Sequence, residues 1–247
     1  LLLFPLVFTG CRKDDITALD DSINNGTDSE VVEPPAHFSF TGANDPAPRK
    51  ITFTKSSGTV IAWNWDFGDG STSVLASPSH IYTSGGSYSA TLTAYGEENT
   101  QDIISKTVAI GNKPTMLKIT SLKIWSIPFV NDNGVSWDLL DGPDVYFKIY
   151  KGSSELMSST YYSDVTSGDL PLNWTNVFPL YLTSLYSQHT ISVYDYEIIG
   201  GADDFIGGYS FAPSNSMPTN GVSSYPSYID LSLSGSDVSI TLYVEWI

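Results

Sequence analysis

The sequence predicts a mainly β protein, and its composition supplies the first reasons. Aromatic residues make up 13% of the chain, with 15 Tyr, 11 Phe and 6 Trp. Such side chains suit the pleated, half-buried surface of strands. Gly and Pro are scattered between short apolar runs, as turns that join strands require. Because no long segment shows the 3.6-residue apolar period of a helix, we expect an all-β fold.

The chain is strongly acidic, and this excludes one class of partner. Its net charge is −16, and residues 113–247 alone hold 5 basic and 14 acidic residues, a net charge of −9. A chain without a basic surface is not expected to bind nucleic acid. It also lacks the Lys/Arg cluster that would draw it to an anionic membrane. Calcium is a more natural partner, because hard cations take oxygen ligands.

The first residues predict a targeting segment. Residues 1–10 read LLLFPLVFTG, and the single cysteine, Cys11, follows. This run is shorter than the ~20 residues of a membrane-spanning helix and fits the apolar part of a secretory signal. Thr9-Gly10-Cys11 resembles the lipobox of bacterial lipoproteins, which implies cleavage before Cys11, its lipidation and an anchor in the outer membrane. A buried free cysteine after an ordinary signal is the alternative.

Residues 11–35 are expected to form a tether. The four residues after Cys11 read RKDD and resemble the export signals that send lipoproteins of Bacteroidetes-type bacteria to the cell surface. The rest of the segment is rich in Asp, Ser, Asn and Gly. Low hydrophobicity with charge of mainly one sign predicts a disordered linker.

Residues 36–112 form the first predicted domain. Residues 63–70 read WNWDFGDG, residues 78–82 read PSHIY, and residues 86–94 read GSYSATLTA. In this order they resemble the signature of the PKD domain, with Ala90 where the family usually has Val. The resemblance implies an immunoglobulin-like sandwich that spaces, presents or binds and rarely reacts.

The residue pattern of this domain also predicts two strands without reference to the family. One strand is expected where Ile61, Trp63, Trp65 and Phe67 alternate with smaller or polar residues. A second is expected where four apolar residues alternate between residues 88 and 94, namely Tyr88, Ala90, Leu92 and Ala94.

Three polar residues of the first domain could be mistaken for a catalytic group. Asp66 and Asp69 lie beside glycines, where Asp usually stabilises a turn through local backbone amides. His80 is expected to be a packed, hydrogen-bonded residue of the family and not a general base.

Residues 113–247 form the second predicted domain, and two of its segments are rich in carboxylates. Residues 144–148 read DVYFK, residues 193–197 read VYDYE, and residues 204–207 read DFIG. Together they resemble the C2 domain, a β-sandwich that binds calcium between loops at one end. The metal ligands that the resemblance implies are Asp132, Asp138, Asp144, Asp195, Glu197 and Asp204.

The calcium hypothesis has a chemical basis and a plain alternative. Calcium takes six to eight oxygen ligands, and crowded carboxylates repel one another unless they are neutralised. The family's Pro is missing after Asp144, Glu197 replaces an Asp, and Asp132 and Asp138 compete for one ligand place. The alternative is that these acids are ordinary solvated side chains.

An enzyme is not expected. The sequence has three histidines, His37, His80 and His189, and they form no recognisable Ser/His/Asp arrangement. A glycine-rich phosphate loop is absent from it too. A carboxylate pair for glycoside hydrolysis remains open, because its spacing is invisible in sequence.

Binding is the expected function, in one of two forms. The first is a surface lipoprotein that acts in calcium-dependent binding or adhesion to protein partners. The alternative is a glycan-binding lipoprotein of a polysaccharide uptake system, or an accessory protein of a glycoside hydrolase. Five aromatic residues suit sugar stacking, although most are expected in the core: Trp125, Trp137, Trp174, Tyr161 and Tyr162. Exposed aromatics in a row would favour glycans, and a clustered acid pocket would favour calcium-dependent contact.

Overall fold

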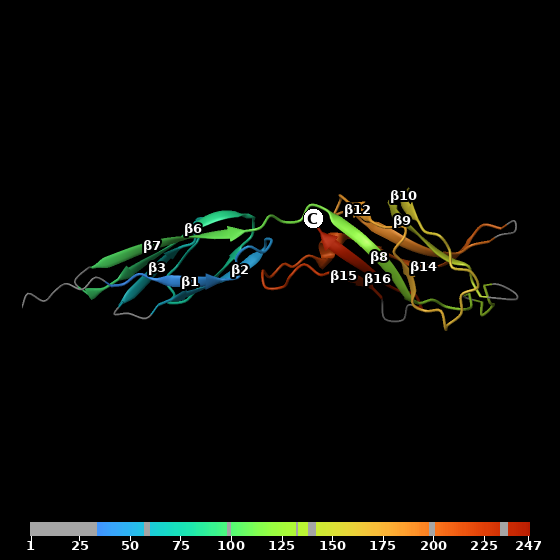
Figure 1. The fold of residues 1–247 in the computed structure, drawn as a ribbon, viewed down its shortest axis with the longest axis horizontal. Helices are drawn as coiled ribbons and strands as arrows, with labels where there is room; N and C mark the ends of the chain where they lie inside the picture. Colours follow the sequence, from blue (N-terminus) through green and yellow to red (C-terminus); the bar gives the residue numbers. More distant parts are fainter. Residues whose placement is uncertain are drawn as a thin grey trace, which may run out of the picture.

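The computed structural model describes residues 34–56, 60–97, 100–131, 133–137, 142–197, 201–232 and 237–247. In these ranges the chain forms two β-sandwiches arranged end to end (Figure 1), which confirms the predicted all-β class. Cys11, Asp132 and Asp138 lie outside the described residues. In the parts that the structure describes, no helix is long and apolar enough to span a membrane.

The first sandwich consists of two antiparallel sheets. One has three strands in the order β1-β2-β5, and the other has four in the order β4-β3-β6-β7. The strand bounds are β1 Phe38–Thr41, β2 Arg49–Lys55, β3 Ala62–Asp66, β4 Thr72–Ser73, β5 Ser79–Tyr82, β6 Gly86–Tyr95 and β7 Gln101–Ile110.

Trp65 is the centre of the first core. Its ring is fully buried and meets the Phe38 ring edge-on, with centroids 5.1 Å apart. Its indole N–H donates to the carbonyl of Leu75 at 2.8 Å, so its one polar atom is satisfied. Phe67 is also buried, as the alternation predicts. The predicted strand position is wrong for Ile61, which is 69% exposed because β3 begins only at the next residue.

The second sandwich also has two antiparallel sheets. Their orders are β10-β9-β13-β14 and β11-β8-β16-β15, with β12 pairing to β8 beside β11. The bounds are β8 Leu117–Ser126, β9 Val145–Lys151, β10 Ser154–Ser158, β11 Leu172–Trp174, β12 Leu180–Leu182, β13 His189–Asp195, β14 Asp204–Phe211, the 3-10 helix η2 Pro213–Ser216, β15 Tyr228–Leu231 and β16 Ser239–Trp246.

The central strand β13 shows how the sequence sets the two faces of its sheet. Ile191 and Val193 are fully buried in the core between the sheets, and the outward Tyr194 remains half-buried. His189 and Asp195 continue the inward row at its two ends and are buried as well. Alternation of this kind follows from the period of two in a strand.

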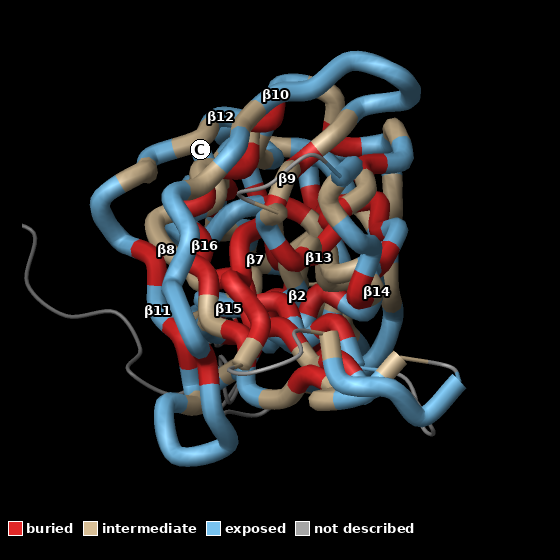
Figure 2. Tube along the Cα trace, turned by 90° about the vertical axis from the view of Figure 1, so that its right-hand side faces the viewer, coloured by how far each residue is buried: buried red, intermediate tan, exposed pale blue. Residues whose placement is uncertain are grey.

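Trp174 anchors the second core. Its ring meets Phe147 edge-on, with centroids 5.2 Å apart and an interplanar angle of 87°. Its indole N–H donates to the carbonyl of Thr160 at 2.9 Å. Viewed along the long axis, the buried stretches gather in the middle, and the exposed loops surround them (Figure 2).

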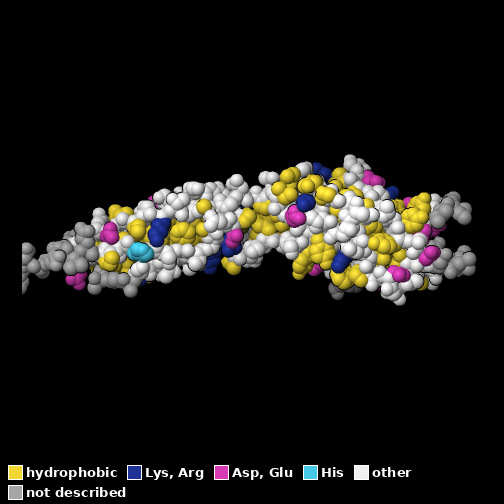
Figure 3. Space-filling view, viewed as in Figure 1, with side chains coloured by type: hydrophobic (Ala, Val, Ile, Leu, Met, Phe, Trp, Pro, Cys, Tyr) yellow, Lys and Arg dark blue, Asp and Glu magenta, His cyan; other side chains and the backbone are white. Residues whose placement is uncertain are grey.

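The two sandwiches contact each other through the segment that precedes β15. The amide of Lys50 in β2 donates to the carbonyl of Gly221 at 2.7 Å, and the Tyr225 hydroxyl donates to the carbonyl of Ala47 at 2.8 Å. A cavity of about 360 Å³ lies beside these bonds, with Arg49 and Trp246 among its lining residues. Apolar side chains are visible on the surface where the two sandwiches meet (Figure 3).

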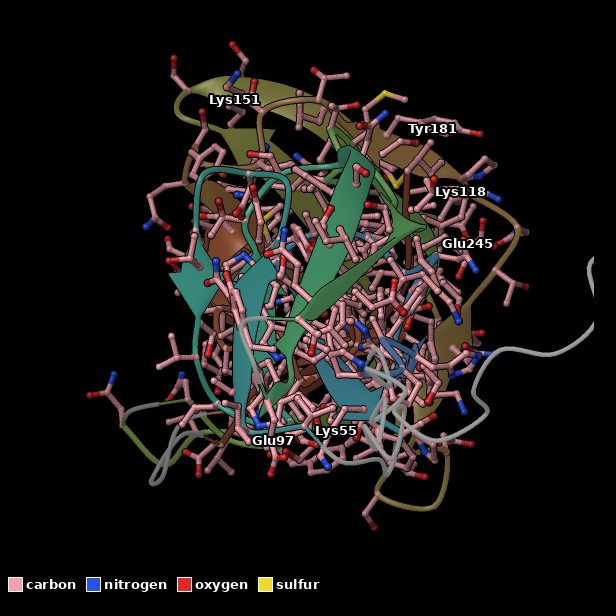
Figure 4. All side chains as sticks on the ribbon, turned by 90° about the vertical axis from the view of Figure 1, so that its left-hand side faces the viewer. Lys55, Glu97, Lys118, Lys151, Tyr181 and Glu245 are labelled. Carbon is pink, nitrogen blue, oxygen red and sulfur yellow. The ribbon has the colours of Figure 1, made fainter. Side chains whose placement is uncertain are left out.

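A charged pair stands next to this junction on the second sandwich. Glu245, which lines the cavity, accepts a hydrogen bond from the Lys118 ammonium at 2.8 Å. This bond raises the pKa of Lys118 above its ordinary value. Tyr181 lies close to the pair (Figure 4). Because the groups are solvated, we expect the pair to contribute little to stability.

Gly221→Ala should change the arrangement of the two sandwiches while both remain folded. Gly221 has a φ of +68°, and an added Cβ would lie 2.8 Å from the Lys50 amide nitrogen and 3.1 Å from Ile81 Cγ2. The clash should break the contact between the sandwiches. Residual dipolar couplings measured by NMR would then give different alignment tensors for the two parts.

Gly152→Ala is the matched control, because Gly152 has a φ of +59° and no atom within 4 Å of an added Cβ. It should incur only the backbone strain, on the order of 1–2 kcal/mol, and leave the arrangement intact. An unchanged arrangement in the Gly221 variant would mean that this contact does not hold the sandwiches together.

Candidate functional site

The second sandwich carries a groove of about 620 Å³ beside the edge strand β14. Its walls come from the segment after β8, the first half of β14 and the residues before β16. The lining residues are Pro128, Val130, Asn131, Asn133, Trp137, Asp204, Phe205, Ile206, Gly207, Asp237 and Val238. These described lining residues include two carboxylates, two amides and two aromatic rings, and there is no Lys or Arg among them.

One wall is a turn that its own side chains hold in place. The Asn131 side-chain oxygen accepts hydrogen bonds from the amides of Asn133 at 3.0 Å and Val135 at 3.2 Å. Asn favours turns because its side chain can bond the local backbone in this way. Trp137 follows, and its indole N–H donates to the carbonyl of Pro128 at 2.8 Å. These bonds hold the Trp137 ring and the polar groups of the turn at the groove wall.

Phe205 is placed by a β-bulge. Val193 lies opposite Gly207 and Tyr194 lies opposite Phe205, so Ile206 is an extra residue in β14. A bulge bends the strand and redirects the side chains beside it. Ile206 is buried, whereas Phe205 is 58% exposed. The bulge therefore lets the edge strand keep its core contact and still present an aromatic ring at the surface.

A set of tyrosines continues from Phe205 over the outer side of the sheet. The Phe205 ring lies 5.8 Å from Tyr194, and Tyr194 stacks on Tyr146 at 5.4 Å. Tyr146 meets Tyr196 edge-on at 6.2 Å, and Tyr196 stacks on Tyr161 at 5.0 Å. We call Tyr146, Tyr161, Tyr194 and Tyr196 the tyrosine face.

Polar groups fix the buried part of the tyrosine face. The Tyr146 hydroxyl donates to the Asp203 carboxylate, which also accepts from the amide of Glu197 at 3.2 Å. Burial and this carboxylate raise the pKa of Tyr146 well above its ordinary value, so its hydroxyl stays protonated. The Lys148 ammonium lies 5.5 Å from the Tyr146 ring centroid and 5.6 Å from that of Tyr194, a cation–π arrangement.

Four of the six predicted calcium ligands are described, and the sheet brings them to one end. Asp195 ends β13 and lies opposite Asp204, the first residue of β14, and opposite Val145, the residue after Asp144. Glu197 follows β13 by two residues. The four carboxylates thus lie at one end of the sheet, and whether they bind calcium stays a prediction from the C2 resemblance.

Some oxygen atoms of these carboxylates already accept hydrogen bonds from the backbone. Asp195 is fully buried and accepts a hydrogen bond from the Asp144 amide at 2.6 Å. Asp144 in turn accepts from the amide of Asp164 at 2.9 Å. Across the described ranges, no group of three or more His, Cys, Asp or Glu is placed to hold a metal ion. The complete ligand set needs either Asp132 or Asp138, which lie outside the described residues, so it stays a prediction.

The five aromatics proposed for sugar stacking fall into two groups. Trp174 is core, and Trp137 is partly buried against the core. The other three are between 40% and 47% exposed, so the expectation that most of the five belong to the core is wrong: Trp125, Tyr161 and Tyr162.

The sequence prediction did not include three residues of the groove and its surroundings as binding residues, namely Phe205, Tyr196 and Asp237. Strand alternation could have indicated the tyrosines, because Tyr146 and Tyr194 occupy outward positions.

The polar residues of the first sandwich have the structural roles that the sequence predicts. Asp66 accepts from the amide of Gly68 at 2.8 Å, and Asp69 accepts from that of Ser71 at 3.0 Å. The second oxygen of Asp69 lies 2.6 Å from Nε2 of His80. Burial acts against ionisation, but the bonds from His80 and Ser71 hold the pKa of Asp69 below its ordinary value. These groups stabilise the turn.

Comparison with known proteins confirms the first sandwich as a PKD domain. Residues 32–110 match the family model of the PKD domain. The pre-pro-metalloprotease PrtV of Vibrio cholerae is 33% identical over 82 residues, which cover 33% of this chain and 9% of that protein. Collagenase ColQ1 of Bacillus cereus is 29% identical over 108 residues, which cover 43% of this chain and 10% of that protein.

Among solved structures, the PKD1 domain of PrtV is 28% identical with a TM-score of 0.30, and the match covers 33% of this chain and all of that domain. The matched part is thus about a tenth of the length of the curated relatives. The similarity concerns a PKD domain and does not extend to the protease or collagenase activity in their names.

Asp195→Ala should destabilise the second sandwich. The substitution removes the acceptor of the buried Asp144 amide, and an unsatisfied buried donor costs about 1–3 kcal/mol. Urea unfolding followed by circular dichroism would measure the loss. Asp204→Ala is the control, because that side chain is exposed at the groove and should cost little. Equal stabilities of the two variants would contradict a structural role for Asp195.

Proposed function

We propose that this chain is a non-catalytic binding protein whose second sandwich binds a carbohydrate in the groove beside β14. The observation that carries the proposal is a concave, largely polar groove that contains the rings of Trp137 and Phe205. Ligand sites are usually clefts in which apolar surface provides contact and a few polar groups set orientation. A sugar offers matching chemistry, with C–H faces for the rings and hydroxyls for carboxylates and amides.

The charge of the groove favours an uncharged ligand. Asp204 and Asp237 are the charged residues of its described lining. The predicted second domain, residues 113–247, has a net charge of −9. A sulfated or uronic-acid polymer would bring like charge to these carboxylates, which disfavours binding. Hydroxyls of a neutral sugar can instead donate to them, and hydrogen bonds to a charged acceptor are the stronger kind.

The first sandwich has a different part in this proposal. A PKD domain placed end to end with the binding sandwich would act as a spacer between the binding site and the start of the chain (Figure 1). Anchoring through a lipid on Cys11 and exposure at the cell surface stay predictions from the sequence.

Binding to neutral polysaccharides tests the proposal. Affinity gel electrophoresis of the full chain would use mixed-linkage β-glucan, galactomannan, xylan and starch, with polygalacturonate as the acidic counterpart. At least one neutral polymer should retard the protein, and polygalacturonate should not. Phe205→Ala should raise the dissociation constant derived from the retardation about two- to tenfold, because an aromatic contact is worth about 0.5–1.5 kcal/mol. A binding module should also leave the length of the polymer unchanged.

Tyr186→Ala is the control, since Tyr186 is 80% exposed and does not line the groove. Retardation by none of the neutral polymers, or equal retardation of the wild type and the Phe205 variant, would contradict carbohydrate binding in this groove.

Calcium-dependent binding of a protein partner is the second candidate. The observation in its favour is that the β9-β13-β14 sheet brings Asp144, Asp195 and Asp204 to one end, although no three acids among the described residues are placed to hold a metal ion by themselves. Oxygen ligands of this kind suit calcium. Asp144 and Asp195 already accept backbone hydrogen bonds, which leaves fewer oxygens for a metal.

Thermal unfolding of the full chain in calcium and in chelator tests this candidate. An ion that binds only the folded state raises its stability by mass action. The candidate predicts a higher melting temperature in calcium and the loss of that difference in Asp204→Ala. Identical melting curves with and without calcium would exclude a calcium site and leave the carbohydrate proposal unaffected.

A further inference from the structure

The groove does not end at Phe205. The Phe205 ring lines the groove and also contacts Tyr194, the first ring of the tyrosine face. From Tyr194 the ring contacts run through Tyr146 to Tyr196 and Tyr161, with centroids of neighbouring rings 5.0–6.2 Å apart. Phe205 therefore joins a concave site to an aromatic surface on the outside of the same sheet.

We propose that the ligand of the groove is an extended polysaccharide chain that continues past Phe205 onto the tyrosine face, so that the binding site has at least two sugar subsites. This inference rests on the proposed function, because it extends the same site and names the class of carbohydrate. A protein that recognised a single terminal sugar would need the groove alone.

The exposed rings of the tyrosine face suit sugar contact. Tyr161 is 47% exposed and Tyr196 is 41% exposed, and their rings are within 18° of parallel. Tyr146 is almost fully buried beneath this layer, with its hydroxyl held by Asp203. Because tyrosine has few rotatable bonds, a ring supported by its neighbours loses little conformational freedom on binding.

The charges of this surface also fit a neutral chain. The Lys148 ammonium lies 3.9 Å from the Glu155 carboxylate, and Asp203 accepts the hydroxyl of Tyr146. Positive and negative groups therefore offset each other beside the rings. Among the described residues of this surface, the Lys148–Glu155 pair thus leaves little net charge beside the rings, which suits an uncharged ligand.

Oligosaccharides of different length test the inference. Isothermal titration calorimetry of the full chain would use β-1,4-linked gluco-, manno- and xylo-oligosaccharides of two and six residues. For the sugar type that binds, the hexasaccharide should bind at least tenfold more tightly than the disaccharide. Tyr196→Ala and Tyr161→Ala should remove most of this advantage and leave disaccharide binding unchanged, whereas Phe205→Ala should weaken both ligands.

Tyr181→Ala is the matched control, because Tyr181 is 50% exposed but belongs to β12, which pairs with β8 in the opposite sheet. It should leave both affinities unchanged. Hexasaccharide affinity that is unaffected by Tyr196→Ala and Tyr161→Ala, with Phe205→Ala still weakening binding, would overturn the extended site while the groove proposal stands. Absence of binding by every oligosaccharide, together with no retardation by the polysaccharides, would overturn both.

Discussion

Alternation of side chains along the strands of the second sandwich decides which residues form the core and which remain for binding. In β13 the fully buried Ile191 and Val193 point between the sheets, while Tyr194 points outward. Burying each aliphatic side chain contributes about 1.5–3 kcal/mol, so the register is strongly specified. A slip by one residue would expose this row and bury the tyrosine. The tyrosine face therefore depends on the same packing that holds the sandwich together.

The candidate site arises where this regular pattern is interrupted. The bulge at Ile206 keeps one side chain of the edge strand in the core and turns Phe205 outward. The turn at Asn131 brings Trp137 to the other side of the groove. Bulges commonly lie at sheet edges and next to functional sites, where they redirect a side chain. The second sandwich thus combines a core of ordinary alternation with an irregular edge that faces solvent.

The sequence predicted the fold more fully than the site, and the residues show why. The PKD signature and the alternation around Trp65 depend on near neighbours in sequence, so both could be recognised there. The groove instead joins Asn131, Phe205 and Asp237, which only the pairing of β14 with β13 and of β16 with β8 brings together. The carboxylates were expected as metal ligands, but Asp144 and Asp195 accept amides in the fold. The hydrogen-bond partner of a side chain depends on the tertiary structure, which the composition and residue spacing of the sequence do not reveal.

The most direct test of carbohydrate binding in the groove is an NMR titration of the isotope-labelled full chain with a neutral hexasaccharide. The indole N–H of Trp137 lies at the groove wall, and that of Trp125 lies on the opposite sheet, where it donates to Thr241. Our account predicts shifts of the Trp137 indole signal and of the Phe205 amide, with the Trp125 signal unchanged. Shifts confined to Trp125 and its neighbours, or no shift in any of these signals, would contradict it.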